Sequence, residues 1–250
     1  MRPFLFFAAA GACLLGLAPA TRSAEPVRFT SGPARVSLLE LYTSEGCSSC
    51  PSAERWLGRF RDAPGLWREV VPVAFHVDYW NRLGWPDRFS STDFTRRESA
   101  YAAAWGADSV YTPCVVRDGA EWRTRETPPA APRDARAAGT LTVDYDGATL
   151  RATFVPPLVR ADERPPDASA YELHAAILGA GIVSTVTAGE NRGETLRHEF
   201  IALGLAHGTP GRDLAIAVPP VAGVPRHALA VWVTRRASLV PVQATGGWLD

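Results

Sequence analysis

The pattern of apolar and polar residues in the first half of the chain alternates between strands and a helix. The apolar runs at 38–42 and 70–77 have the length of buried strands. Between them a helix is indicated by apolar residues at i, i+3, i+4 and i+7, namely Ala53, Trp56, Leu57 and Phe60. Because strand–helix–strand units are right-handed with parallel strands, we expect both strands to end at the same edge of the sheet.

A second helix and a hairpin are predicted further along. The helix begins at about Thr92, and Gly106 is expected to end it. β-branched and aromatic residues then flank Pro113, and Asp118-Gly119 predicts a hairpin turn. A proline at the entrance of a strand is a candidate for a cis peptide bond.

The second half of the chain shows short alternating runs that are typical of β-strands. Residues 141–155 form a clear hairpin around the turn Asp146-Gly147. Further strands are predicted at 171–178, 182–186, 196–205, 214–218 and 229–233. Strands at such turn-separated intervals suggest an antiparallel β-sandwich.

These patterns predict an α/β domain followed by an all-β domain. The α/β domain covers residues 25–125, and the sandwich-like antiparallel domain covers residues 140–250. Between them, residues 126–139 contain prolines, alanines and charges without periodicity, which indicates a linker.

The first 24 residues have the features of a secretory signal peptide. A positive start at Arg2 precedes an apolar run from Phe4 to Leu17, and small residues at 18–20 and 22–24 offer cleavage sites. We therefore expect an exported protein, periplasmic or secreted. No second long apolar run follows, so no membrane span is expected in the mature chain.

Composition narrows the classes of function. The formal net charge is zero, which gives no argument for binding nucleic acid or an anionic membrane. All 26 basic residues are arginine, so a Schiff-base lysine or a P-loop lysine is excluded. No cofactor is expected from these features.

The most reactive chemistry is expected at Cys47 and Cys50, which lie at the mouth of the first predicted helix. Lowering a thiol pKa of about 8.5 by ~2 units takes roughly 2.7 kcal/mol. The helix dipole typically gives ~0.3–1 kcal/mol and at most ~2 kcal/mol. Hydrogen bonds from the backbone N–H groups of Ser49 and Cys50, or from a serine hydroxyl, would supply the remainder.

Several motifs together resemble a known family. They are residues 40–51 with the C-x-x-C motif, 76–80 with 83–85, 111–113 and 189–193. The chain resembles a secreted, thioredoxin-like family known as domain of unknown function 1223. The resemblance implies a thioredoxin-like fold for the first domain and a site at the C-x-x-C motif, but the family label carries no established reaction.

The resemblance to thioredoxin-like redox proteins also implies roles for three further residues. Pro113 would pack on the disulfide in its cis form, and Thr112 would offer backbone groups to a substrate. Glu40 looks similar to the buried acid that moves the proton of the second cysteine. The alternatives for Glu40 are a solvent-facing position or an ion pair with an arginine.

Cys114 stands where the family usually has a glutamine. Because strand side chains alternate between faces, it should point away from Pro113 and be a buried, unreactive thiol. We interpret the 189–193 turn as structural. The scattered histidines are expected on strand faces or in loops rather than as ligands: His174, His198, His207 and His227.

Three hypotheses for the function follow. The first is a thiol–disulfide oxidoreductase whose partners are cysteine-containing proteins or peptides bound through mixed disulfides, with Cys50 resolving the bond made by Cys47. The second is a metal-binding or delivery protein that holds Cu(I) with Cys47, Cys50 and His76. The third is a redox-inert interaction protein in which the disulfide only stabilises a turn.

Overall fold

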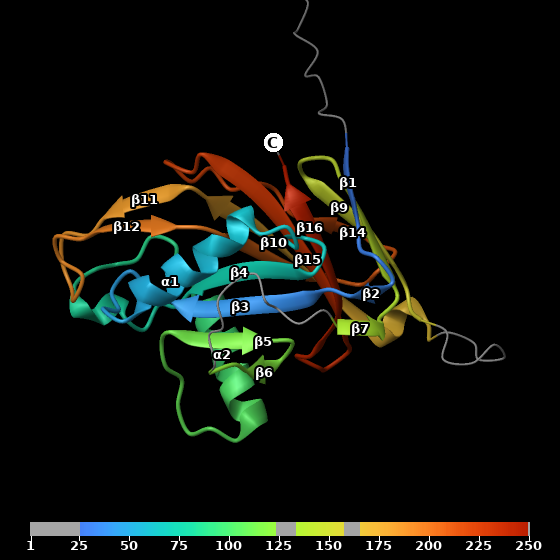
Figure 1. Cartoon of the computed structure of the whole chain (residues 1–250), viewed down its shortest axis with the longest axis horizontal. Helices are drawn as coiled ribbons and strands as arrows, with labels where there is room; N and C mark the ends of the chain where they lie inside the picture. The colour runs from blue at the N-terminus through green and yellow to red at the C-terminus, as the bar shows by residue number, and fades with distance from the viewer. Residues whose placement is uncertain (1–25, 124–133, 158–165, 250) are drawn as a thin grey trace, which may run out of the picture.

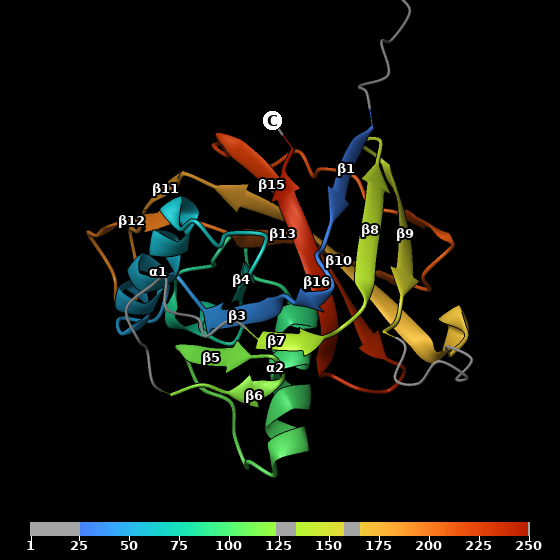
Figure 2. The same ribbon diagram turned by 45° about the vertical axis from the view of Figure 1, so that its right-hand side comes forward.

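A mixed eight-stranded sheet combines strands from both halves of the chain. The computed structural model describes residues 26–123, 134–157 and 166–249. The sheet order is β16-β15-β10-β13-β4-β3-β5-β6 (Figure 1; β13 is labelled in Figure 2). The strands are β3 (Ser37–Thr43), β4 (Val70–His76), β5 (Cys114–Arg117), β6 (Ala120–Glu121), β10 (Tyr171–Ala180), β13 (Ile201–Gly208), β15 (Arg226–Arg235) and β16 (Pro241–Trp248). The protein is therefore mostly β, with few helices and one large mixed sheet.

A smaller four-stranded sheet packs against one face of the large one. Its order is β1-β8-β9-β14, and its strands are β1 (Val27–Thr30), β8 (Thr140–Tyr145), β9 (Thr149–Val155) and β14 (Asp213–Ala215). Figure 2 shows β1, β8 and β9 side by side. Alternate residues of β8 and β9 are buried, as expected for strands with one face on a core. They share that core with inward-facing residues of β10 and β15, including Leu173, Ile177, Leu229 and Val231.

The two long helices cover opposite faces of the large sheet. α1 (Cys50–Gly58) lies on the face to which Thr43 points, because Thr43 donates a hydrogen bond to a side chain of α1. α2 (Thr92–Trp105) lies on the face to which Tyr42 points, since the ring of Tyr42 packs edge-on against Tyr101 of α2. Consecutive strand residues point to opposite faces, so β3 is covered on both sides and all seven of its residues are buried.

The first half follows the predicted pattern. β3 and β4 are parallel neighbours, α2 ends at Gly106 with a positive φ of 70°, and Asp118-Gly119 turns the β5–β6 hairpin. After α1, a short 3-10 helix, η1 (Arg59–Asp62), completes the helical segment. A second 3-10 turn, η2 (Asn81–Leu83), lies in the loop before α2, and η3 (Ala168–Ala170) precedes β10.

Two predictions about the second half need correction. The single strand expected at 196–205 is broken at Phe200, whose φ is 61°, into β12 (Thr195–His198) and β13. β12 pairs with β11 (Ile182–Thr185) in a separate hairpin. The described part of the expected linker includes a strand, β7 (Asp134–Ala137), which pairs with β2 (Ala34–Arg35).

The all-β half shares its sheets with the first half instead of forming a sandwich of its own. β13 runs parallel to β4, and the N–H of Ala74 donates to the carbonyl of Phe200 at 2.8 Å. Conversely, β1 from the N-terminal part pairs with β8. These pairings join segments that are far apart in sequence.

The expected signal peptide, residues 1–24, lies outside the described residues. Among the residues that are described, no helix is both long enough and apolar enough to cross a membrane.

Candidate functional site: a disulfide beside a buried charged cluster

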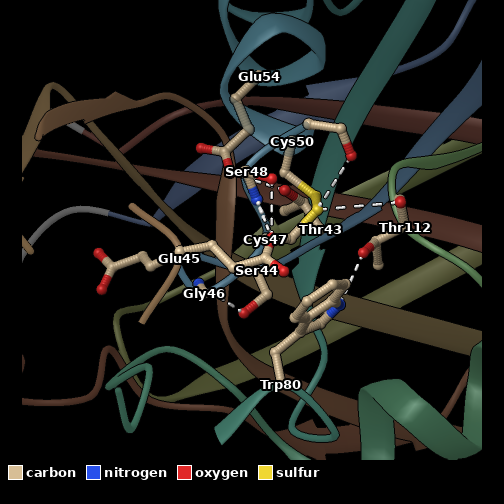
Figure 3. The surroundings of a disulfide bond; sticks show 12 residues. Thr43, Ser44, Glu45, Gly46, Cys47, Ser48, Cys50, Glu54, Trp80 and Thr112 are labelled. Atoms are coloured by element: carbon tan, nitrogen blue, oxygen red, sulfur yellow. Dashed lines mark hydrogen bonds between the residues drawn. A yellow bond between two sulfur atoms is a disulfide. The ribbon is translucent and has the colours of Figure 1, made fainter. Parts of the chain in front are cut away.

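The two cysteines of the C-x-x-C motif form a disulfide where β3 passes into α1 (Figure 3). Their Cα atoms are 5.4 Å apart. The side chains of Cys47 and Cys50 are buried, with 1% and 0% exposed, whereas Ser48 and Ser49 between them are exposed. The disulfide therefore lies just below a surface formed by the serine pair.

The hydrogen bonds around Cys47 differ in part from those expected. The hydroxyl oxygen of Ser49 lies 3.4 Å from Sγ of Cys47, as predicted for a serine hydroxyl. The N–H of Cys50, however, donates to the carbonyl of Cys47 at 3.2 Å and not to its sulfur. The Ser49 hydroxyl is thus placed to stabilise a Cys47 thiolate together with the helix dipole, whereas the N–H of Cys50 is used elsewhere.

The structure brings Thr112 next to Cys47. The Thr112–Pro113 peptide bond is cis, as predicted. The carbonyl oxygen of Thr112 lies 3.8 Å from Sγ of Cys47, and Nε1 of Trp80 donates to the Thr112 hydroxyl at 2.7 Å (Figure 3). Cys114 follows as a buried free thiol, and burial raises its pKa to about 12. The expectation that Cys114 is a buried, unpaired thiol is confirmed.

The turn at 189–193, expected to be structural, holds the cysteine loop. The side-chain amide of Asn191 donates to the carbonyls of Glu45 and Cys47 at 2.8 and 2.9 Å. The carboxylate of Glu190 accepts from both the N–H and the hydroxyl of Ser48, which lowers the Glu190 pKa. A segment from the second half of the chain thus fixes the loop that presents the disulfide.

Below this loop lies a histidine–carboxylate cluster made of Glu45, Glu54, His76, Asp87 and His198. Nδ1 of His76 is bonded to Oδ2 of Asp87 at 2.7 Å, and the N–H of Glu45 donates to the same oxygen at 2.9 Å. Nδ1 of His198 is bonded to Oε2 of Glu54, and Nε2 of His198 lies 3.2 Å from Oε1 of Glu45. All five side chains are buried.

Ion pairing within the histidine–carboxylate cluster shifts its pKa values in a consistent way. The carboxylates Glu54 and Glu45 raise the pKa of His198 to about 10 against the effect of burial. Asp87 likewise raises the pKa of His76. In return the histidines outweigh burial and lower the pKa values of the three carboxyl groups.

Glu40 is not brought to the disulfide. Its carboxylate accepts from Arg97 at 2.7 and 3.2 Å, from Tyr42 at 2.9 Å and from Tyr101 at 2.6 Å. This Glu40–Arg97 cluster lies under α2, on the face of β3 opposite to α1 and Cys50. The ion pair with an arginine, one of the alternatives considered from the sequence, is the arrangement that the structure shows.

The structure does not bring Cys47, Cys50 and His76 together as a group of possible metal ligands. Among the described residues, ligand atoms converge in two places: Glu54 with His76 and His198, and Glu172 with His174 and His207. Neither group contains Cys47 or Cys50, which are bonded to each other. Sequence reasoning anticipated His76 but missed its partners Asp87, Glu54 and His198. Glu54 alone gave a local signal, since it follows Cys50 by one helical turn.

The fold and the site define a class: a mostly-β protein with a large mixed sheet and a buried disulfide at a strand-to-helix turn. The chain belongs to the family described as "Protein of unknown function (DUF1223)", whose sequence model matches residues 38–234. No curated protein matches the chain.

Two solved structures share the fold. The crystal structure of protein AGR_C_4864 from Agrobacterium tumefaciens has a TM-score of 0.59 and 23% sequence identity, and the match covers 86% of this chain and 94% of that one. HBP35 of Porphyromonas gingivalis has a TM-score of 0.52 and 11% identity, with 88% of this chain and 77% of that one covered. At these identities the likeness concerns the fold alone.

Proposed function

We propose that the protein is an exported thiol–disulfide oxidoreductase of the thioredoxin-like type, acting through Cys47 and Cys50. The arrangement of the first half supports this proposal. Parallel β3 and β4 are joined through α1, α2 follows on the other face, and β5 and β6 complete the order β4-β3-β5-β6 with β5 antiparallel to β3. This is the order of elements expected for a thioredoxin-like domain with its cysteines at the start of the first helix.

The observation that carries the proposal is the position of Thr112 against Cys47. Its carbonyl oxygen lies 3.8 Å from the sulfur, on a segment that begins with the exposed Tyr111. A substrate peptide in extended form would bind beside this segment through main-chain hydrogen bonds, as in other modes of strand addition. Its own cysteine would then approach the sulfur of Cys47.

The reaction follows the ordinary course of thiol–disulfide exchange. In the reduced protein the thiolate of Cys47 attacks one sulfur of a substrate disulfide, and the other substrate sulfur leaves as a thiolate. The thiolate of Cys50 then attacks Sγ of Cys47, which releases the second substrate thiolate and re-forms the protein disulfide. Two electrons pass from the protein to the substrate, and the reverse sequence oxidises a dithiol.

The burial of both sulfurs limits access to the disulfide, and it also supports a second candidate function, that of a redox-inert interaction protein. With 1% and 0% of Cys47 and Cys50 exposed, attack requires the exposed Ser48-Ser49 segment to move aside. The same burial suits a disulfide that only stabilises the turn, in a redox-inert interaction protein. The two candidates differ in whether the reduced Cys47 reacts faster than an ordinary thiol.

Trapping the mixed disulfide tests the proposal. The reduced Cys50→Ser variant, incubated with a disulfide-bonded peptide, should accumulate a mixed disulfide at Cys47, because the resolving thiol is missing. Cys47→Ser should form none, and Cys114→Ala should react like the wild type. Alkylation at graded pH gives the independent readout, with a midpoint for Cys47 well below the free-thiol value of about 8.5. Equal reactivity of Cys47 and Cys50, with midpoints near that value, would favour the structural disulfide.

The proposed partners are cysteine-containing proteins or peptides, and the proposed location is the periplasm or the exterior of the cell. A disulfide is typical of proteins exported to oxidising compartments.

A further inference from the structure

Three possible metal ligands from three different elements meet in the interior beside the disulfide. His76 ends β4, His198 ends β12, and Glu54 lies on α1 one turn after Cys50. Their ligand atoms all lie within 4.8 Å of one another, and the side chains are 0%, 1% and 6% exposed. We propose that Glu54, His76 and His198 bind a divalent transition-metal ion, with Zn²⁺ as the representative ion, independently of thiol exchange at the neighbouring cysteines.

Each of the three ligands has a partner that fixes its orientation. Oδ2 of Asp87 holds Nδ1 of His76 at 2.7 Å and turns Nε2 away from itself. The hydroxyl of Thr43 donates to Oε1 of Glu54 at 2.7 Å and leaves Oε2 for His198. A carboxylate behind a ligating histidine, and a hydrogen bond behind a ligating carboxylate, are the usual outer partners of a protein metal site.

The same arrangement extends to His198. Its Nδ1 faces Oε2 of Glu54, whereas its Nε2 lies 3.2 Å from Oε1 of Glu45. Metal bonds to Nδ1 of His198 and Oε2 of Glu54 would replace the hydrogen bond that now joins these two atoms. Nε2 of His198 would then donate to Glu45, whose other oxygen already accepts from Nε1 of Trp85 at 2.7 Å.

Nε2 of His76 is the atom that most directly indicates a ligand. It is fully buried, and no hydrogen-bond partner for it is found among the described residues. Buried polar atoms are nearly always bonded, and an unpaired one costs free energy. A metal ion would use the lone pair of this nitrogen.

The charges around the site suit a divalent cation. Three carboxylates, from Glu45, Glu54 and Asp87, surround the two imidazoles. In the described part of the chain, the ion-pair partners of these three carboxylates are the two histidines. Two imidazoles and a carboxylate suit Zn²⁺ and the later divalent ions of the first transition series. They do not suit Ca²⁺ or Mg²⁺, which prefer oxygen ligands alone.

Of the three proposed ligands, Glu54 is the one that lines a surface pocket, so we expect an ion to approach the site past its carboxylate. Glu54 lines a pocket of about 400 Å³ that also includes Ser48 and Pro51. The pocket wall carries Arg55 and Arg192 as well, so we expect a cation to enter slowly and to be retained once bound.

Zinc titration of the oxidised protein tests the proposal. The chain without residues 1–24 is stripped with a chelator, equilibrated for hours with ZnCl₂ and analysed for bound metal. We expect one Zn²⁺ per chain, although Cys47 and Cys50 stay paired. His76→Gln and His198→Gln should abolish this binding, and Asp87→Asn should weaken it about 10–100-fold because it removes only the orienting carboxylate.

His207→Gln is the matched control, since His207 belongs to the second histidine group, which lines a separate pocket together with Arg96 and Arg97 of α2. It should leave the stoichiometry at one. Co²⁺ in place of Zn²⁺ gives a readout on the wild type alone: visible d–d absorption without a thiolate-to-cobalt charge-transfer band. Circular dichroism shows whether His76→Gln and His198→Gln fold. If they do not, the zinc affinity of Asp87→Asn and the cobalt spectrum of the wild type still test the proposal.

Three results would overturn the proposal. They are the absence of Zn²⁺ from the folded, oxidised wild type, undiminished binding in the folded His76→Gln and His198→Gln variants, and a charge-transfer band that Cys47→Ser removes. None of these results depends on whether Cys47 exchanges disulfides, so the metal site and the redox proposal can fail separately.

Discussion

β3 separates two buried charged clusters that are built in different ways. On the α2 face, both oxygens of Glu40 are bonded to Arg97 and to two tyrosine hydroxyls. On the α1 face the histidine–carboxylate cluster is equally buried, yet Nε2 of His76 has no hydrogen-bond partner in the part of the chain that the structure describes. A complete set of hydrogen bonds is what a purely structural cluster needs, whereas an incomplete set indicates a place for a ligand or a proton.

The position of each cluster supports the same distinction. The Glu40–Arg97 cluster joins β3 to α2, and Tyr101 extends it to the carbonyl of Leu239. The histidine–carboxylate cluster lies directly under the loop that carries Cys47, and Glu45 belongs to both. We therefore interpret the first cluster as structural and the second as functional.

The largest effect is expected from breaking the Glu40–Arg97 cluster. Glu40→Gln leaves the guanidinium of Arg97 buried without a counter-charge, and arginine cannot lose its proton. The free energy of unfolding should fall by about 3–5 kcal/mol, measured by urea denaturation. The control is Asp144→Asn, which breaks the exposed ion pair with Arg28 and should cost at most about 1 kcal/mol. A loss from Glu40→Gln as small as that of the control would refute the structural interpretation.

A second test on the α2 face uses Glu98, which follows Arg97 in the sequence. Within the described ranges, neither of its carboxylate oxygens has a hydrogen-bond partner. Burial raises its pKa from 4.5 to about 7. The folded state therefore binds the proton more tightly than the unfolded state, so stability should be lost as the pH rises from about 4.5 through 7. A shift of this size corresponds to roughly 3 kcal/mol.

Glu98→Gln should remove this pH dependence. Its free energy of unfolding should equal that of the wild type near pH 4 and exceed it by up to about 3 kcal/mol at pH 8. Urea denaturation at both pH values provides the measurement. An equal difference between variant and wild type at the two pH values would contradict the raised pKa.

A smaller loss of stability is expected when a carboxylate of the histidine–carboxylate cluster is replaced by an amide. Glu54→Gln keeps a side-chain oxygen for Thr43, and His198 can lose its proton when the carboxylate is removed. We expect a loss of only about 1–3 kcal/mol at pH 7, measured with a chelator present.

The pKa of His198, about 10 in the wild type, should fall in Glu54→Gln and be seen in an NMR titration of the imidazole. Glu194→Gln, at an exposed position on the same side of the protein, should change neither quantity. An unchanged His198 pKa in Glu54→Gln would mean that the two side chains are not paired.

The helices and strands of the first half could be predicted from the sequence, because apolar spacing and turn residues mark each of them locally. β3, α1, β4, α2 and the β5–β6 hairpin form close to where apolar spacing and turn residues placed them. β16 was missed since Gln243, Gly246 and Gly247 interrupt its apolar pattern. Small residues are needed there: a Cβ at Gly247 would overlap the ring of Phe29, and one at Gly246 would overlap the carbonyl of Leu229.

The pairing of β13 with β4 could not be predicted from local patterns. It depends on Ala74 pairing with Ile201 and bonding to the carbonyl of Phe200, more than a hundred residues away, and no period along the chain encodes such a contact. The residues of the site were predicted only where a local motif marks them. Cys47, Cys50 and Thr112 were identified from their motifs, whereas His198 reaches the cluster only through the β11–β12 hairpin. Glu40 was placed on the correct strand, but its partner, Arg97, comes from a helix on the far face.

The reduction potential of the Cys47–Cys50 disulfide tests the central claim most directly. The oxidised chain without residues 1–24 is equilibrated in glutathione buffers, and the reduced fraction is measured by trapping free thiols. A catalytic pair should give a potential near or above about −230 mV, and Cys114→Ala should leave that value unchanged. A potential below about −300 mV would contradict the redox proposal and identify the disulfide as a structural bond of the turn.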